Sequence, residues 1–91
     1  MPEKLRRTLR IRNRLGMHAR SSAAFVQTAS KFRSEIWVER DTQRVNGKSI
    51  MGVLMLAASM GTNITVEASG EDAEAALDAL GTLVDGGFGE S

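Results

Sequence analysis

The only histidine of the chain, His18, lies between a glycine and the start of a stretch with helical periodicity. Neutral imidazole is a nucleophile that can accept a phosphoryl group and pass it on. Arg20 follows two residues later, and its guanidinium offers N–H donors that suit phosphate oxygens. If a helix begins after His18, its unpaired backbone N–H groups point to the same place. The pattern predicts a phosphoryl-acceptor site, although a lone histidine before a helix is usually only a surface residue or a cap.

Hydrophobic periodicity predicts the elements that must position this site. Alternating apolar and polar residues predict strands over 5–13, 34–40, 44–46 and 63–69. Helical spacing predicts helices over 19–30, 49–59 and from 71 to about 84, and the glycine-rich residues 86–89 are expected to fray. Strands with one apolar face and helices with one apolar stripe predict an α+β fold, a two-layer open-faced sandwich. The length predicts one domain over residues 1–91.

Composition excludes several classes of protein. The chain has 91 residues and a net charge of +1. Because it has no cysteine, it has no disulfide framework, and a single histidine without cysteine makes a zinc site improbable. We therefore expect no metal and no cofactor. No apolar stretch is long enough to span a bilayer, and the basic N-terminus lacks the apolar segment of a signal peptide, so we expect a cytoplasmic protein. Cations gather at the N-terminus and none follows Lys48, but most of the early arginines are expected to line a solvated strand face.

The predicted helix over 49–59 is apolar on two sides, and Ser49 is a favourable N-cap for it. One stripe, expected to face the core, consists of Val53, Leu56, Ala57 and Met60. The other is expected to be partly exposed, because only one stripe can face a two-layer core. We predict a partner-docking surface from this second stripe and from a residue beside the histidine: Met17, Ile50, Met51, Leu54 and Met55. Alternatively, a loop covers the second stripe.

Two segments resemble one known family. Residues 15–20 (LGMHAR) resemble the active-site segment of HPr, the histidine-containing phosphocarrier of the bacterial phosphotransferase system, and residues 45–54 (VNGKSIMGVL) resemble its regulatory-serine segment. Together with the chain length and the order of the elements, the two segments extend the resemblance over nearly the whole chain. The resemblance implies an antiparallel sheet with the strand order 1-4-2-3. The family usually has proline where this chain has Ser21, so the rigidity of the helix start is in question.

The resemblance also implies a mechanism and partners. His18 would accept a phosphoryl group at Nδ1 from Enzyme I, which takes it from phosphoenolpyruvate, and would donate it to IIA proteins for sugar uptake. Arg20 and the helix N-terminus at Ala19 and Ser21 would spread the transferring charge. The chain would act as a monomeric carrier rather than as an enzyme. In part of the family, the serine that matches Ser49 is phosphorylated by an HPr kinase/phosphorylase, so Ser49 would be a regulatory site; alternatively, it is an ordinary N-cap.

Three other functions remain open. Residues 13–18 and the ending Gly87-Phe88 look more like the regulatory, nitrogen-related branch of the same system, whereas the serine segment looks more like the sugar-uptake branch. A corepressor that acts when Ser49 is phosphorylated is compatible with either branch. A nucleic-acid-binding module would use cations and the tryptophan of the open sheet face, namely Arg6, Arg10, Arg12 and Trp37. A near-neutral charge and a single aromatic residue make that face a weak stacking platform, so we do not expect nucleic-acid binding.

Overall fold

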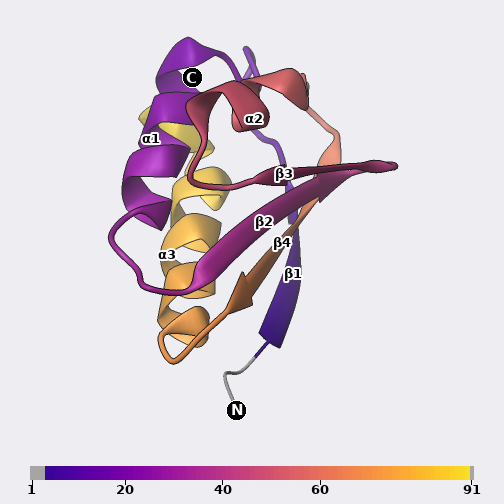
Figure 1. Ribbon diagram of the computed structural model, residues 1–91. Helices are drawn as coiled ribbons and strands as arrows, with labels where there is room; N and C mark the ends of the chain where they lie inside the picture. Colours follow the sequence, from indigo (N-terminus) through magenta and orange to yellow (C-terminus); the bar gives the residue numbers. More distant parts are fainter. Residues whose placement is uncertain (1–3, 91) are drawn as a thin grey trace.

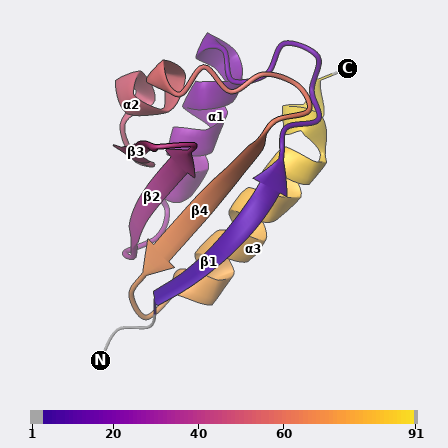
Figure 2. The ribbon, with the colours of Figure 1, turned by 90° about the vertical axis from the view of Figure 1, so that its right-hand side faces the viewer.

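Four antiparallel strands form one sheet in the order β1-β4-β2-β3, and the helices lie on one of its faces (Figure 1). The computed structural model describes residues 4–90. Its elements, in chain order, are β1 (Lys4–Arg10), α1 (Ala19–Ala29), β2 (Glu35–Arg40), β3 (Gln43–Asn46), α2 (Ile50–Met55), β4 (Asn63–Ser69), α3 (Ala73–Asp85) and the 3₁₀ turn η1 (Gly87–Gly89). The predicted α+β open-faced sandwich and its strand order are confirmed. Figure 2 shows the sheet from the face that the helices leave open.

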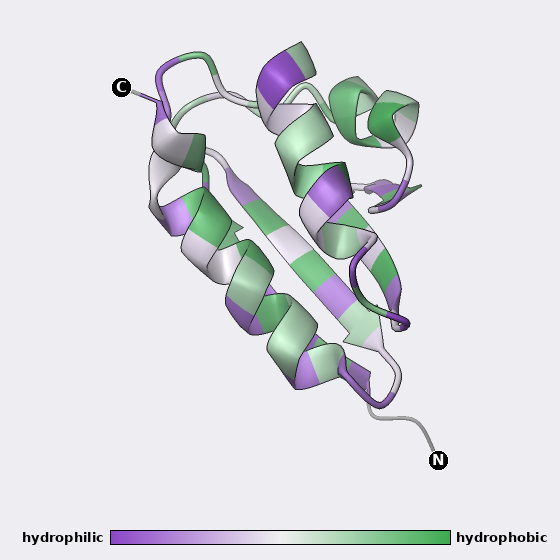
Figure 3. Ribbon diagram, turned by 90° about the vertical axis from the view of Figure 1, so that its left-hand side faces the viewer, coloured by the Kyte–Doolittle hydropathy of each residue, from purple (hydrophilic) through white to green (hydrophobic). Residues whose placement is uncertain are grey.

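The core lies between the sheet and the helices. Apolar residues alternate with polar ones along the central strand between the two long helices (Figure 3), as predicted from the period of two. Ile64, Val66 and Ala68 of β4 are buried. Helical spacing also predicts one buried stripe on α3, and its members are all buried: Ala73, Ala76, Leu77, Leu80 and Val84. Within residues 4–90, no helix combines the length and the apolar character that crossing a bilayer requires.

Helix α1 buries a different stripe from the one that the alanines predict. Helical spacing of the apolar residues predicts one inward stripe of Ala19, Ala23, Val26 and Ala29, but Ala19 is exposed and Ala23 and Val26 are only half-buried. The buried residues are instead Ser21, Ser22, Phe25 and Ala29. The large Phe25 side chain points into the centre of the core and is fully buried, which sets the rotation of the helix. The first turn therefore directs Ser21, rather than an alanine, towards the interior.

Helix α2 is shorter than predicted, because it ends at Met55 rather than near residue 59. Val53 and Leu56 are buried as expected, but Ala57 has a left-handed backbone with φ of 50° and is exposed. This reversal turns the chain so that Ala58 enters the core and Met60, which was expected to face inward, is 56% exposed. The loop after α2 thereby approaches the segment that precedes α1.

The open face of the sheet has a tryptophan and a buried carboxylate covered by arginines. Glu67 is only 3% exposed, and its two carboxylate oxygens accept hydrogen bonds from Arg6 and Arg44. The Arg44 guanidinium also lies over Trp37, 5.0 Å from the ring centroid, so Trp37 covers a neighbouring side chain. Because these arginines are paired with carboxylates, this face has less positive charge available for a nucleic acid than the sequence alone suggests.

The segment after α3 is ordered against the molecule, contrary to the expectation that it frays. Gly87 is buried, and the half-buried Phe88 packs against the hydrophobic core. Backbone φ angles of 64° at Gly87, 57° at Phe88 and 73° at Gly89 turn the chain back towards the start of α1. This turn places Glu90 beside His18.

Candidate functional site

His18 is the N-cap of α1, with φ of −109° and ψ of −174°. Its Nδ1 accepts a long hydrogen bond of 3.4 Å from the backbone N–H of Arg20, in the first turn. The side chain of His18 is 29% exposed, so the ring is accessible from solvent. The first backbone N–H groups of a helix have no partner within the helix and carry partial positive charge. Nδ1 therefore faces a place where a negative group is stabilised.

Ser21 fixes the backbone of the histidine. Its hydroxyl accepts a hydrogen bond of 2.9 Å from the His18 N–H and donates one of 2.8 Å to the carbonyl oxygen of Gly16. The residue is fully buried. The serine that replaces the family's usual proline thus holds the helix start through side-chain hydrogen bonds, which together with His18 form a capping box. Because the hydroxyl is occupied in this way, any contact between Ser21 and a phosphate would involve its backbone N–H.

The loop before His18 is held close to the loop after α2. The Met17 N–H donates a hydrogen bond of 2.8 Å to the carbonyl oxygen of Ala58. Gly16 has φ of +65°, and a Cβ there would lie 2.4 Å from the same oxygen, so the close approach requires glycine. Met17 itself is 6% exposed and belongs to the hydrophobic core. The prediction that Met17 lies on the docking surface is therefore wrong as to its exposure.

Glu90 and Asn13 complete the site, and sequence reasoning missed both. Glu90 Oε2 lies 2.7 Å from His18 Nε2, while Glu90 Oε1 accepts a hydrogen bond of 2.9 Å from the Asn13 side-chain amide. The same amide donates a hydrogen bond of 2.7 Å to the Gly16 carbonyl oxygen. The hydrogen bond from Asn13, then that from His18, hold the pKa of Glu90 below its usual value of 4.5. The signal that could have located Glu90 is Phe88, an apolar anchor inside a glycine-rich tail.

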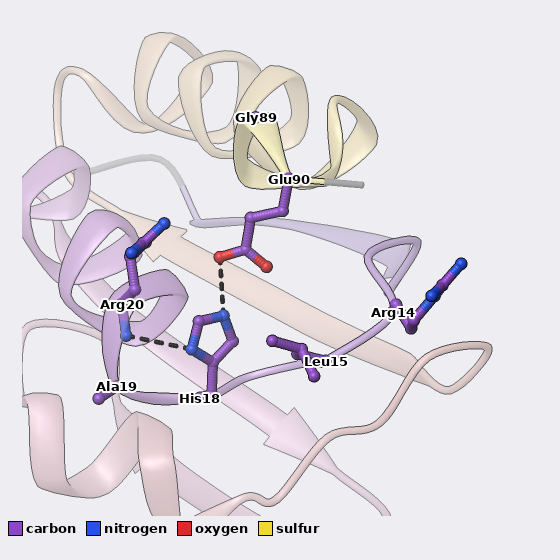
Figure 4. Close-up of a pocket in the computed structure, with 7 residues that line it drawn as sticks. All are labelled: Arg14, Leu15, His18, Ala19, Arg20, Gly89 and Glu90. Atoms are coloured by element: carbon purple, nitrogen blue, oxygen red, sulfur yellow. Dashed lines mark hydrogen bonds and ion pairs between the residues drawn. The ribbon is translucent and has the colours of Figure 1, made fainter.

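These residues surround an open pocket of about 810 Å³, lined by Arg14, Leu15, His18, Ala19, Arg20, Gly89 and Glu90. Figure 4 shows the His18 ring between the Arg20 backbone and the Glu90 carboxylate, whereas the Arg14 side chain points away from the ring. Arg20 is exposed, and its guanidinium has no hydrogen bond or ion pair with any residue of the described range 4–90. The predicted residues His18, Ala19, Arg20 and Ser21 are thus brought together. Nowhere in 4–90 do three metal-ligating side chains cluster.

The predicted regulatory serine and the apolar stripe lie on α2. Ser49 is the N-cap of this helix, and its Oγ accepts a hydrogen bond of 3.1 Å from the Gly52 N–H. The stripe is largely solvent-exposed: Ile50 is 44% exposed, Met51 68% and Met55 67%, whereas Leu54 is half-buried. Leu15, beside the histidine, and Met60 are also exposed, at 70% and 56%. Figure 1 shows α2 at the same end of the molecule as the start of α1.

The chain is similar in sequence to phosphocarrier proteins over nearly its whole length. Residues 5–85 match the sequence model of a family described as "PTS HPr component phosphorylation site". Over 86 residues the chain is 54% identical to the phosphocarrier protein HPr of Neisseria meningitidis serogroup A, an alignment that covers 94% of this chain and 97% of that protein. The region that matches the family model includes His18, Arg20 and Ser49, but it ends at residue 85, before Glu90.

Solved structures are similar over nearly the whole length. The crystal structure of HPr-C-His from Thermoanaerobacter tengcongensis is 49% identical, with a TM-score of 0.92, and the match covers 96% of this chain and 98% of that one. A phosphocarrier protein HPr from Bacillus anthracis is 41% identical, with a TM-score of 0.85, and the match covers 89% and 96%. With this sequence similarity, this fold and a histidine at the start of α1, the chain belongs to the HPr family, the phosphocarrier proteins of the phosphotransferase system.

Proposed function

We propose that His18 accepts a phosphoryl group on Nδ1 from the phosphohistidine of Enzyme I and donates it to a histidine of a IIA protein. Phosphoenolpyruvate is the original donor. The observation that carries this proposal is the position of Nδ1, which lies at the N-terminus of α1 and faces the Arg20 N–H. The family match in residues 5–85, described as a phosphorylation site, supports the same assignment.

The chemistry needs little from the carrier beyond positioning and electrostatic stabilisation. The Nδ1 lone pair attacks phosphorus while the bond to the donor nitrogen breaks. The first N–H groups of α1 and the Arg20 guanidinium then stabilise the negative charge on the phosphoryl oxygens. Because the pocket is open and the ring is 29% exposed, a second protein can reach the phosphoryl group and remove it.

We propose that the partners bind the exposed apolar side chains of α2 next to this pocket. The docking surface consists of Ile50, Met51, Leu54 and Met55. Flexible methionines adapt to different surfaces, which suits a carrier that binds Enzyme I and a IIA protein in turn. The cationic side chains of Arg14 and Arg20 at the pocket favour a partner with acidic groups around its own histidine.

Ser49 is proposed as a regulatory phosphorylation site for an HPr kinase/phosphorylase. A phosphate on this half-buried hydroxyl would replace the hydrogen bond to Gly52 and add negative charge beside Ile50 and Met51. Binding to an acidic surface of Enzyme I would then weaken. The test is incubation with an HPr kinase and ATP followed by mass spectrometry, with Ser49→Ala as the control; an unmodified wild-type chain would contradict the assignment.

For the branch of the system we propose sugar uptake, on the strength of the serine segment at residues 45–54. The nitrogen-related branch keeps the support of residues 13–18 and of the Gly87-Phe88 ending. The phosphorylated protein can be mixed with a sugar-type IIA protein or with a nitrogen-type IIA protein. Faster transfer to the sugar-type acceptor is expected, and faster transfer to the nitrogen-type acceptor would reverse the choice.

The carrier role itself is tested with His18→Ala. Enzyme I and phosphoenolpyruvate should phosphorylate the wild-type chain and leave this variant unmodified, with its circular dichroism spectrum and thermal midpoint close to those of the wild type. Lys31→Ala, at an exposed cation just after the other end of α1 and outside the pocket, serves as the matched control and should still be phosphorylated. A folded His18→Ala protein that gains an acid-labile phosphate would refute the proposal.

A further inference from the structure

The C-terminal segment delivers a carboxylate to the reactive histidine. Gly89, with φ of +73°, completes the turn that follows the anchor Phe88. A Cβ on Gly89 would meet no atom within 4 Å, so glycine is favoured here by its positive φ and not by a lack of room for a side chain. The turn places Glu90, which is separated from His18 by 72 positions, against the edge of the ring. Glu90 lies outside the region that the family match covers, so the match assigns it no role.

Glu90 is held in place independently of the histidine. Its Oε1 accepts the hydrogen bond from Asn13, whose side chain is in turn fixed by its hydrogen bond to the Gly16 carbonyl oxygen. Asn13 is 1% exposed and the Glu90 side chain 14% exposed, so the carboxylate is partly shielded from water. Its other oxygen, Oε2, is thereby directed at His18 Nε2 at 2.7 Å. The arrangement of a fixed amide, a carboxylate and an imidazole edge is that of a group that orients a histidine.

The carboxylate determines which ring nitrogen holds the proton. The hydrogen bonds from Asn13 and His18 keep the pKa of Glu90 low, so at neutral pH the group is ionised and only accepts hydrogen bonds. A short contact with Nε2 then requires the proton on Nε2 and leaves the lone pair on Nδ1. Nδ1 in turn accepts the hydrogen bond from the Arg20 N–H, which is consistent with the same tautomer.

We propose that Glu90 is a positioning residue for phosphoryl transfer: it fixes the His18 ring with its proton on Nε2 and its Nδ1 lone pair directed at the N-terminus of α1. It also stabilises the positive charge that the ring acquires when Nδ1 is phosphorylated. This inference rests on the proposed carrier function and adds a residue to it.

The transfer step balances without a further reactant. The Nδ1 lone pair of His18 forms the new N–P bond, and the N–P bond of the donor phosphohistidine breaks, with its electron pair staying on the donor ring. The donor ring, which carries a proton on its other nitrogen, leaves as neutral imidazole, and His18 becomes a phosphorylated imidazolium that keeps its Nε2 proton. On donation to the next protein the same proton makes His18 a neutral leaving group. Among residues 4–90, the charged groups at the pocket are Arg14, Arg20 and Glu90, and only Glu90 can stabilise this cationic ring.

The proton on Nε2 is tested in the free protein, without any partner. In protein labelled with ¹⁵N at histidine and kept at a pH where the ring is neutral, we expect a slowly exchanging Nε2–H signal and an unprotonated Nδ1. Glu90→Ala should lose the slow exchange, because Nε2–H becomes exposed to water. Glu90→Gln keeps a neutral acceptor and should retain part of the protection. Glu71→Gln removes an exposed carboxylate just before α3, 53 positions from His18, and its Nε2–H exchange should match that of the wild type. A protected Nε2–H in Glu90→Ala, or a protonated Nδ1 in the wild type, would overturn the proposal.

The effect on transfer is measured with Enzyme I and phosphoenolpyruvate. Glu90→Ala is expected to lower kcat about tenfold, with KM nearly unchanged, because a charge-assisted hydrogen bond to the ring is lost while the docking surface on α2 is intact. Glu90→Gln should fall between Glu90→Ala and the wild type. If the wild type itself is not phosphorylated, the proposed function fails, whereas the Nε2–H measurement still stands. If all variants are phosphorylated with equal kcat, the carrier function stands and the role of Glu90 falls.

Discussion

Ser21 shows how a single hydroxyl replaces the constraint that a proline would impose. Proline fixes its own backbone angle, whereas Ser21 fixes its neighbours by accepting a hydrogen bond from His18 and donating one to Gly16. The presence of serine was evident from the sequence, but its partners depend on the turn at Gly16, which helical periodicity does not describe. His18 is therefore held by residues on both sides of it.

Ser21→Ala should lower the free energy of unfolding by about 1–2 kcal/mol, because it removes the hydrogen bond from the His18 N–H and the one to the Gly16 carbonyl oxygen. Urea unfolding measures the change. Ser30→Ala, at an exposed serine just after α1, is the matched control and should change the stability by less than about 0.5 kcal/mol. Equal stability of Ser21→Ala and the wild type would show that the hydroxyl does not hold the helix start.

Helix α2 illustrates what periodicity cannot predict at the scale of an element. The apolar pattern continues past Met55, yet the helix ends there because Ala57 adopts a left-handed conformation that no local residue type signals. The hydrogen bond between Met17 and Ala58 joins this loop to the one before His18, so a tertiary contact accompanies the early end of the helix. This early end leaves Met60 exposed near the proposed docking surface.

Ala57→Gly should raise the free energy of unfolding by about 0.5–1 kcal/mol, because glycine adopts positive φ without the steric cost that alanine bears. Thermal or urea unfolding reports the change. The same substitution at Ala75, an exposed position inside α3, should instead lower stability by about 1 kcal/mol. Destabilisation at both positions would contradict the strained turn.

The proposed docking surface predicts a separate effect on binding. Met51→Glu is expected to lower kcat/KM for phosphorylation by Enzyme I by about tenfold or more, through KM, because it places a negative charge in an apolar contact. Its stability should change little, since Met51 is 68% exposed. Ala75→Glu introduces the same charge on α3 and should leave the kinetics unchanged. Equal KM values in both variants would exclude α2 as the surface that Enzyme I binds.

At the scale of the whole molecule, contacts within and between neighbouring elements were predictable and the most distant ones were not. The alternation in β4 has a period of two residues and the buried stripe of α3 a period of 3.6 residues. Both periods can be read from the local sequence, so the core residues of these elements were predictable. The contacts of Glu90 with His18 and Asn13 join positions 72 and 77 residues apart, and no local pattern encodes such pairs. The glycines that suggested a frayed tail are instead what allows it to turn back.

Charge pairing across the molecule predicts how stability depends on pH. Hydrogen bonding by Arg44 lowers the pKa of Glu67, that by Arg6 lowers the pKa of Glu39, and that by Ser34 lowers the pKa of Asp72. A carboxyl whose pKa is lower in the folded state takes up protons first in the unfolded state. Its contribution is therefore present above the ordinary values of 4.5 for Glu and 3.8 for Asp, and it is lost as the pH falls through the lower folded values.

The free energy of unfolding should accordingly be nearly constant from pH 7 to about pH 5 and should decrease progressively below it. Glu67→Gln should be less stable than the wild type at pH 7, and the difference should shrink as the pH falls below the ordinary Glu value of 4.5, because the unfolded wild-type chain then takes up a proton on Glu67 while the folded carboxylate still resists protonation. Urea unfolding at several pH values measures both curves. A difference that stays constant with pH would mean that the charge of Glu67 is irrelevant to folding.

The central claim, that the phosphoryl group resides on Nδ1 at the start of α1, is tested most directly by locating the N–P bond. The protein, labelled with ¹⁵N at histidine, is phosphorylated with Enzyme I and phosphoenolpyruvate and is examined by ³¹P and ¹⁵N NMR. We expect coupling between phosphorus and Nδ1 of His18, with the proton retained on Nε2. Coupling to Nε2, or phosphate on any other residue, would contradict the account.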